Sequence, residues 1–230
     1  MEQGKTEPWL CRAENDRLYV AKGRSALISG CIKELICAQL GRGFGLPIPA
    51  FELLEIPIDL LAMDSRYPRE LGEQPLFGSE YQDFLEEFNR TFLRVIDPQL
   101  LRDLFLFDYW IKNEDRTFTA NGGNPNVFYR NSDHCVAVID HNLAFDPDFN
   151  VGGFRNLHLG RDAWYDGTIL GLRVGEYQEK MASVMEKFDG YCHNLPPEWR
   201  QDESIAPDFL DRIKSQLLEF TEDYFWEPIT

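Results

Sequence analysis

Alternation of apolar and polar residues near the N-terminus predicts a short β-hairpin. Residues 9–12 and 17–22 have the pattern of two strands joined by a polar turn. Because successive side chains of a strand point to opposite faces, Leu18, Val20 and Lys22 are expected to share one face.

An apolar stripe with helical spacing follows and predicts a helix that ends near residues 41–43. Its apolar members are Leu27, Cys31, Leu35 and Ala38, and Glu34 lies within the same stripe. Prolines at 47 and 49 prevent the helix from continuing. Residues 51–56 then predict a further strand, so the first part of the chain has the order β-β-α-β.

From residue 81 onward the pattern becomes helical. Aromatic and aliphatic residues at helical spacing predict a helix over about 81–95: Tyr81, Phe84, Leu85, Phe88, Phe92 and Val95. Asp97 followed by Pro98 predicts the start of a second helix, over about 99–112. That helix is apolar on nearly all sides, so we expect it to be buried.

The remainder of the chain predicts two strands, 126–130 and 135–140, an irregular stretch to about 175, and two closing helices around 177–188 and 210–224. The fold class expected from this order is α+β. A small β-rich N-terminal lobe over about residues 1–60 would meet a mainly helical C-terminal lobe over about 61–230. A cleft between two such lobes is a usual place for a ligand.

Composition and charge exclude several classes of protein. The 230 residues include 23 basic and 39 acidic side chains, for a formal net charge of −16, which disfavours nucleic acid or an anionic membrane as a partner. No stretch approaches the roughly 20 apolar residues that span a bilayer, and the polar N-terminus lacks a secretory signal. The five cysteines are scattered without a CxxC pair, which is typical of reduced thiols in a cytoplasmic protein.

Three oxygen-bearing side chains are predicted to converge at one end of the second hairpin. Asn126 opens the first strand of that hairpin and Asp140 closes the second, so the two should lie side by side. Asp115 approaches the same end from the loop after the buried helix. Each residue taken alone is typical of a turn, but together they form an oxygen-rich set suited to Mg²⁺.

A second charged pair is predicted in the N-terminal part. A carboxylate within an apolar helical stripe needs a partner, and Lys22 at the end of the preceding strand is the nearest basic candidate for Glu34. Two alternatives stay open: Lys22 leaves the sheet into solvent, or Lys33 or Arg24 neutralises Glu34 instead.

Histidines offer a competing interpretation. His134 and His141 flank the last strand and, with the neighbouring aspartates, allow a hydrolytic metal cluster. No HxxxH or HExxH spacing supports that cluster, so we rank it below the Mg²⁺ site.

The ordered set of Lys, Glu, Asp, Asn and Asp resembles that of protein-kinase-like enzymes, and in detail that of HipA-like kinases. The similarity extends over most of residues 1–165. The matching pieces are residues 32–35 through 45–49, the stretch Phe107-Asp108-Tyr109-Trp110-Ile111-Lys112-Asn113-Glu114-Asp115-Arg116, then Asn124-Pro125-Asn126 and Ile139-Asp140-His141.

The resemblance implies a single two-lobed kinase domain over residues 1–230 that uses ATP and Mg²⁺. Lys22 would hold the α- and β-phosphates of ATP and would be oriented by Glu34. Asp115 would accept the proton of the attacking hydroxyl. Asn126 and Asp140 would bind Mg²⁺ bridging the phosphates.

Two departures from the family pattern concern the metal ligands. A small insertion at 118–123 lengthens the interval after Asp115, which leaves either Asn124 or Asn126 as the ligand; we choose Asn126 because a strand begins directly after it. In addition, Asn142 stands where the Asp-Phe-Gly equivalent has glycine.

The third departure concerns the phosphate loop. No G-x-G-x-x-G precedes Lys22, and Gly4, Lys5 and Thr6 are the only candidate for a loop that contacts phosphate. Their position so near the terminus is equally typical of a disordered tail.

The function predicted from this resemblance is that of a Ser/Thr protein kinase acting on an unknown protein. Members of the family can act as toxins that phosphorylate a translation factor or an aminoacyl-tRNA synthetase and pair with a DNA-binding antitoxin. A nucleotide-binding pseudokinase is one alternative, and nucleotidylation or phosphorylation of a lipid or small molecule is another. Arg155 and Arg161, where an activation loop would lie, could meet phosphate or an acidic substrate, although a solvated loop is the simpler interpretation.

Overall fold

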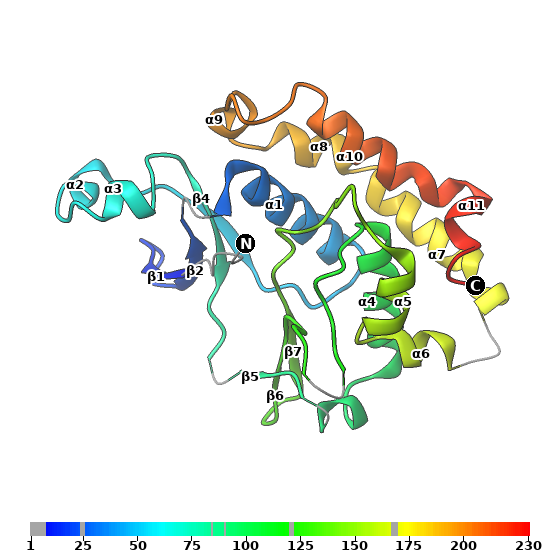
Figure 1. The fold of residues 1–230 in the computed structure, drawn as a ribbon. Helices are drawn as coiled ribbons and strands as arrows, with labels where there is room; N and C mark the ends of the chain where they lie inside the picture. The colour runs from blue at the N-terminus through cyan, green and yellow to red at the C-terminus, as the bar shows by residue number, and fades with distance from the viewer. Residues whose placement is uncertain (1–7, 24–25, 84, 90, 120–121, 167–169) are drawn as a thin grey trace.

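A four-stranded antiparallel sheet and a mainly helical remainder make up the α+β fold (Figure 1). The computed structural model describes residues 8–23, 26–83, 85–89, 91–119, 122–166 and 170–230. The strands of the sheet have the spatial order β1-β2-β4-β3. Their bounds are Pro8–Arg12 for β1, Leu18–Lys22 for β2, Phe51–Leu54 for β3 and Leu76–Glu80 for β4.

The two faces of β2 have different surroundings, as the alternation predicts. Tyr19 and Ala21 are buried in a small apolar cluster that includes Leu61 of α2 (Ile58–Leu61) and is joined by Tyr67 of α3 (Tyr67–Glu70). Val20 and Lys22 line a pocket on the other side of the strand. The sheet therefore has one face that is packed and one face that meets the rest of the molecule.

Helix α1 (Ile28–Gly43) joins the sheet to the C-terminal helices. It contacts β4 on one side and α7 (Leu170–Met185), α8 (Phe188–His193) and α9 (Pro197–Arg200) on others (Figure 1). Burial on several sides explains why apolar residues outside the predicted stripe are also inaccessible, among them Ile32, Ile36, Cys37 and Leu40. The helix that carries Glu34 is consequently held by both parts of the molecule.

Helix α4 (Pro98–Trp110) lies in the centre of the helical part. Asp97 caps it, since its side chain accepts a hydrogen bond from the Gln99 N–H at 2.9 Å, and Pro98 occupies the first turn, which confirms the predicted start. Its far end is tied to the C-terminal segment by the indole of Trp110, which donates to the Leu217 carbonyl at 2.7 Å. The remaining helices are α5 (Val151–Leu157), α6 (Arg161–Tyr165), α10 (Phe209–Leu217), η3 (Leu218–Thr221) and α11 (Asp223–Trp226).

The prediction of a helix over about 81–95 is wrong. The segment instead contributes β5 (Glu86–Glu87), which pairs with β6 (Val127–Arg130), and only the short 3-10 helix η2 (Phe92–Arg94) is helical. Its aromatic spacing comes from packing: the ring of Phe92 lies 4.6 Å from that of Tyr129, centroid to centroid. Tertiary pairing with β6 thus outweighs local helical periodicity; Phe84 lies outside the described residues.

Three other boundaries differ from expectation. The stretch predicted as irregular to about 175 holds α5 and α6, and α7 already begins at Leu170. The predicted final helix is divided among α10, η3 and α11. Strand β4, which the pattern analysis missed, follows residue 60, so the N-terminal sheet extends to Glu80.

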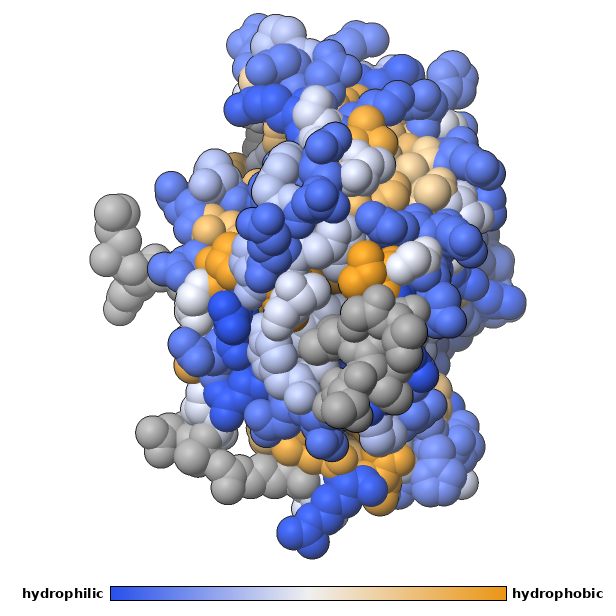
Figure 2. Space-filling model, turned by 90° about the vertical axis from the view of Figure 1, so that its right-hand side faces the viewer, coloured by the Kyte–Doolittle hydropathy of each residue, from blue (hydrophilic) through white to orange (hydrophobic). Residues whose placement is uncertain are grey.

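The surface agrees with the charge balance of the sequence. Figure 2 shows a mainly hydrophilic face on which apolar side chains occur in scattered groups. Among the described residues, every helix is too short or too polar to cross a membrane. All five cysteines are free thiols, as the absence of a CxxC pair predicts.

We expect Gly160→Ala to destabilise the fold, because α4 and the start of α6 approach closely there. A Cβ at position 160 would lie 2.3 Å from the backbone oxygen of Leu101, and forcing the helices apart costs about 2 kcal/mol. Gly190→Ala in α8 is the matched control, since its Cβ would meet nothing within 4 Å. Chemical denaturation measures both variants; equal stability of the two would contradict the close approach.

Candidate active site

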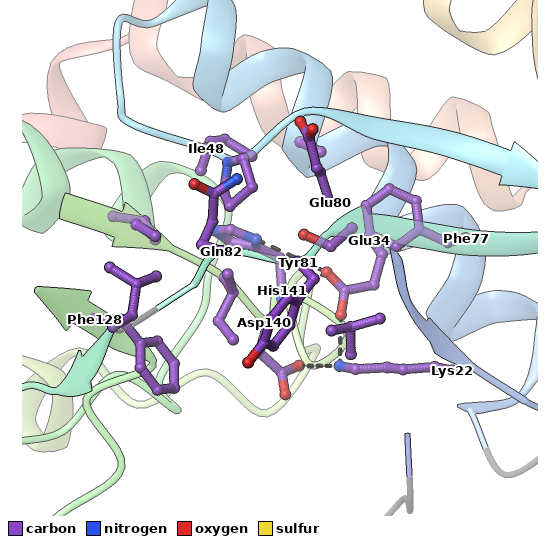
Figure 3. A pocket seen from close by; sticks show the side chains of 18 residues that line it. Lys22, Glu34, Ile48, Phe77, Glu80, Tyr81, Gln82, Phe128, Asp140 and His141 are labelled. Atoms are coloured by element: carbon purple, nitrogen blue, oxygen red, sulfur yellow. Dashed lines mark hydrogen bonds and ion pairs between the residues drawn. The ribbon is translucent and has the colours of Figure 1, made fainter. Parts of the chain in front are cut away.

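A cavity of about 320 Å³ lies where the inner face of the sheet meets α1 and the hairpin of β6 and β7 (Cys135–Val138). Most of its wall is apolar: Val20, Ala38, Ile48, Phe77, Leu85, Phe128, Ala137 and Val138. Three charged side chains meet at one end, where Lys22 points between Glu34 and Asp140, and Glu80 lies apart from them (Figure 3). The pocket therefore offers a mainly apolar space that leads to a charged end.

Lys22 joins three elements that are distant in sequence. Its ammonium lies 2.7 Å from Glu34 Oε1 on α1 and 2.6 Å from Asp140 Oδ1, just after β7. The predicted pair of Lys22 with Glu34 is thus present, and the alternative that Lys22 enters solvent is wrong. Within the described chain Lys33 has no ion pair with Glu34, and Arg24 lies outside the described residues.

The three charges stabilise one another against burial. Burial acts to lower the pKa of Lys22, but Glu34 and Asp140 outweigh it and raise that pKa, so the amine stays cationic. Burial raises the pKa of Glu34, with Lys22 opposing it. Burial likewise acts to raise the pKa of Asp140, but the Lys22 cation lowers it overall. Asp140 is therefore a carboxylate, and two acidic groups face one ammonium.

Asp115 is held by two asparagine amides. Its Oδ2 accepts hydrogen bonds from the Nδ2 of Asn126 at 2.9 Å and from the Nδ2 of Asn124 at 2.7 Å. Both amides point at the same oxygen, so Oδ1 stays available to another donor. The structure thus brings both candidate asparagines to Asp115.

The hairpin places Asn126 next to the strand that leads to Asp140, as its strand order predicts. The N–H of Ile139 donates to the Asn126 carbonyl at 3.1 Å, directly beyond the β6–β7 ladder. Asn126 and Asp140 both have positive φ, at 47° and 61°, a region costly for residues other than glycine. Such conformations persist only where surrounding contacts hold them.

Arg116 supplies those contacts. Its side chain is completely buried, and one terminal nitrogen donates to the carbonyls of Pro125 at 3.1 Å, Asn126 at 2.8 Å and Ile139 at 3.2 Å. Its Nε donates to Asp108 Oδ2 on α4 at 2.7 Å. Because Arg116 directly follows Asp115, its guanidinium holds the loop of Asp115 against the backbone at Asn126 and at Ile139, the residue before Asp140.

Two buried histidines complete this network in the neutral form. His158 donates through Nε2 to Asp108 at 2.9 Å while its Nδ1 accepts the Gly160 N–H at 3.0 Å, so Nδ1 carries no proton. His141 Nε2 accepts from Arg116 at 3.2 Å. Burial lowers the pKa of both, in His141 to about 3 with help from Arg116. Burial acts to raise the pKa of Asp108, but Arg116 outweighs it and leaves that pKa well below its usual range.

The pattern analysis missed the roles of Arg116 and Asp108. A usable signal was present: Asp108 stands in a helix that is apolar on nearly all sides, and a buried carboxylate requires a cation. Arg116 is eight residues away and next to Asp115, which makes it the natural partner.

The remaining sequence candidates are the N-terminal residues 4–6 and two histidines. Gly4, Lys5 and Thr6 lie outside the described residues. His134 is exposed and contacts Tyr129, whereas His141 is buried, so the hydrolytic cluster is not formed. In the described part of the chain no group of three or more His, Cys, Asp or Glu side chains is arranged to hold a metal ion. Within the insertion after Asp115, Thr119 and Gly122 form an isolated antiparallel bridge.

The donor set nevertheless fits Mg²⁺ when phosphates are bound. Mg²⁺ is usually held by one or two protein carboxylates or amides together with substrate phosphates and water, not by a complete protein cage. Asp140 keeps Oδ2 free of Lys22, and Asn126 keeps its amide oxygen because its nitrogen faces Asp115. Asp140 and Asn126 would hold the ion through these two oxygens.

Comparison with known proteins identifies the family. The family model for HipA-like kinases matches residues 1–229. The chain belongs to the HipA-like kinase family. A comparison with curated proteins finds no match.

The fold of this chain is also found in a solved kinase. The crystal structure of a Helicobacter pylori proinflammatory kinase, CtkA, aligns with a TM-score of 0.60 and 12% sequence identity, over 98% of this chain and 92% of that one. The two-lobed kinase fold expected from the sequence is thereby confirmed. At this identity the likeness concerns the fold alone.

We expect Arg116→Met to destabilise the HipA-like kinase strongly. It leaves the buried Asp108 charge with neutral partners, the His158 ring and the Asn113 amide, and breaking a buried ion pair costs about 3–5 kcal/mol. Arg66→Gln, which removes an exposed pair with Asp64, is the control and should have little effect. Urea denaturation measures both; a loss below about 1 kcal/mol for Arg116→Met would contradict a central role for this guanidinium.

Stability should fall below about pH 6.5, the usual pKa of histidine. Between about pH 6.5 and pH 3, His141 binds a proton in the unfolded chain but stays neutral in the folded chain, where its pKa is about 3. Acid therefore favours unfolding. At pH 5 this amounts to about 2 kcal/mol for His141. His141→Gln keeps an acceptor for Arg116 and should flatten the dependence between pH 7 and 5, measured by thermal unfolding at each pH.

Exposed His193 provides the control for this experiment. Its side chain meets solvent in both states, so His193→Gln should leave the pH dependence unchanged. Identical slopes for wild type and His141→Gln would show that His141 is not the group that resists protonation.

Proposed function

We propose that this protein is an ATP- and Mg²⁺-dependent phosphotransferase that acts on a serine or threonine hydroxyl of another protein. The observation that carries the proposal is the position of Lys22, which lies between Glu34 and Asp140 at the charged end of an apolar pocket. Membership of the HipA-like kinase family supports the same activity.

The pocket accounts for binding of the nucleotide. Phe77, Phe128 and Val138 provide apolar surface for the adenine ring, and the charged end lies where the triphosphate would extend. Lys22 would donate to phosphate oxygens while Glu34 holds the ammonium in place. Asp140 and Asn126 would hold Mg²⁺, which neutralises phosphate charge when bound.

Asp115 would act as the proton acceptor. In the transfer, the acceptor oxygen forms a bond to the γ-phosphorus while the bond from that phosphorus to the β,γ-bridging oxygen breaks and ADP leaves. The hydroxyl proton passes to Asp115, whose Oδ1 is free while the asparagine amides hold Oδ2. Such a step relies mainly on positioning and charge stabilisation.

The biological setting is a finer prediction. Pairing with an antitoxin, a toxin role and a protein rather than a lipid or small-molecule acceptor are expectations that derive from the family resemblance. A cytoplasmic location is the expectation from the scattered cysteines. Transfer of AMP instead of phosphate is separated from kinase activity by the mass added to the acceptor, about 329 against about 80, the masses of the two groups.

A nucleotide-binding pseudokinase is the second candidate. The observation that favours it is the sequence before Lys22, which holds no G-x-G-x-x-G. Pro8 of β1 pairs with Lys22, so the turn between β1 and β2 lies at the far end of the hairpin from the ammonium. Binding of ATP without any transfer would identify this alternative.

Transfer of radiolabel from γ-labelled ATP tests the proposal. Asp115→Ala should lower the rate about a hundredfold or more while ATP still binds, because a general base contributes about 10²–10⁴. Asp140→Ala should abolish the Mg²⁺-dependent part of ATP binding, measured by thermal shift with and without Mg²⁺. Lys214→Ala, which removes an exposed lysine, should leave both unchanged. Equal labelling by wild type and Asp115→Ala would overturn the proposal.

The same assay separates the two asparagines. Asn126→Ala should raise the Mg²⁺ concentration needed for half-maximal transfer, since its amide oxygen is the proposed ligand. Asn124→Ala should lower the rate at saturating Mg²⁺ without changing that concentration, because its amide contacts only Asp115. The reverse pattern would assign the metal to Asn124.

A further inference from the structure

Two arginines line a cavity outside the pocket described above. The cavity has a volume of about 520 Å³ and lies between α5 and α6, with Gly152, Arg155, Asn156, Arg161, Asp162 and Tyr165 in its wall. Two cations and one carboxylate leave its lining positive, in a chain whose net charge is −16.

Arg155 is oriented by Tyr165. Its Nε donates to the Tyr165 hydroxyl at 2.9 Å, and its Cζ lies 5.6 Å from the centre of that ring. Among the described residues its two terminal nitrogens have no hydrogen-bond partner. An arginine held in this way presents a planar fork that matches a carboxylate with little further loss of side-chain entropy.

Arg161 is held by a backbone carbonyl, but its ion-pair partner can be replaced. It donates to the Asn156 carbonyl and pairs with Asp162 at 3.1 Å, and these two charged side chains are 40% and 89% exposed. An ion pair so exposed is weak. A carboxylate that enters the cavity can therefore replace Asp162 as the partner of Arg161.

Hydrogen bonds at both ends of α5, the helix beside the cavity, join it to the loop of Asp115. The N–H of Phe118 donates to the Leu157 carbonyl at 2.9 Å, and the N–H of Leu159 donates to the Arg116 carbonyl at 3.3 Å. At the other end of α5, the N–H of Asn150 donates to the side chain of Glu114. Helix α5, which carries Arg155, thus runs beside the loop that would receive the acceptor hydroxyl.

We propose that Arg155 and Arg161 bind a carboxylate side chain of the acceptor protein, at a position near the phosphorylated residue. This substrate preference rests on the proposed kinase function. Both ends of α5 contact the loop of Asp115, so the acidic residue is expected within a few positions of the acceptor hydroxyl.

The net charge strengthens the inference. An acidic segment is repelled by a surface with net charge −16, so its binding requires cations gathered in a concave place. The arginine cavity meets that requirement beside the active-site loop. Selectivity for an acidic acceptor then comes from this cavity and not from the overall field of the protein.

Binding of labelled peptides tests the proposal without requiring phosphate transfer. Each capped peptide has a central serine and a single Glu, moved one position at a time, and is compared with the same peptide carrying Gln. At the best position the wild type should bind the Glu peptide about fivefold more tightly, as expected for about 1 kcal/mol at a partly exposed site. The preference should weaken with added salt.

Variants assign the preference to the cavity. The double variant Arg155→Gln/Arg161→Gln should lose the preference for Glu, and Arg155→Glu should favour a peptide with Lys at the same position. Arg212→Gln, which removes an exposed arginine paired with Asp208, is the matched control and should keep it. A thermal unfolding midpoint equal to that of wild type shows that the double variant is folded.

Failure of this inference is distinguishable from failure of the kinase proposal. No preference for Glu at any position, or a preference that survives in the double variant, overturns the arginine site even if the protein transfers phosphate. A preference that depends on both arginines, in a protein that binds ATP but never labels a peptide, supports the arginine site and leaves the pseudokinase as the function.

Discussion

The buried guanidinium of Arg116 is the interaction on which the site depends. It neutralises Asp108 on α4 and at the same time donates to backbone carbonyls at Pro125, Asn126 and Ile139. Asn126 directly precedes β6 and Ile139 directly follows β7, and Asp140 is the next residue after Ile139. A buried cation is stable only if its donors are satisfied, so the network fixes the loop and the hairpin in one arrangement.

A second charged group, around Lys22, meets this network through His141. The backbone N–H of His141 donates to Glu34 Oε2 at 2.9 Å, while its ring accepts from Arg116. Glu34 lies on α1, which packs against the sheet and the C-terminal helices, so the lysine end of the pocket and the loop of Asp115 are mechanically joined. Neutral histidine suits this place, because an imidazolium there would face the Arg116 cation.

Much of the local structure could be predicted because local signals cause it. Asp97 and Pro98 start α4 through a side-chain cap and a fixed φ, and the alternation at Leu18, Val20 and Lys22 places the lysine on the pocket face of β2. The prediction of a helix over 81–95 failed because this segment pairs with β6 and its Phe92 ring packs against Tyr129 of that strand. Periodicity records which residues are buried, and a packed extended segment can imitate it.

Sequence alone determined which chemical groups exist and which of them need partners: a carboxylate in an apolar helix, oxygen ligands at the ends of a hairpin, and the order of the kinase-like motifs. Only the tertiary structure decided that Lys22 contacts Glu34 and Asp140 together, that both Asn124 and Asn126 hold Asp115, and that Arg116 joins them. The physical reason is distance along the chain. Lys22 and Asp140 are 118 residues apart, and no local preference fixes a contact that depends on how sheet, helix and hairpin pack.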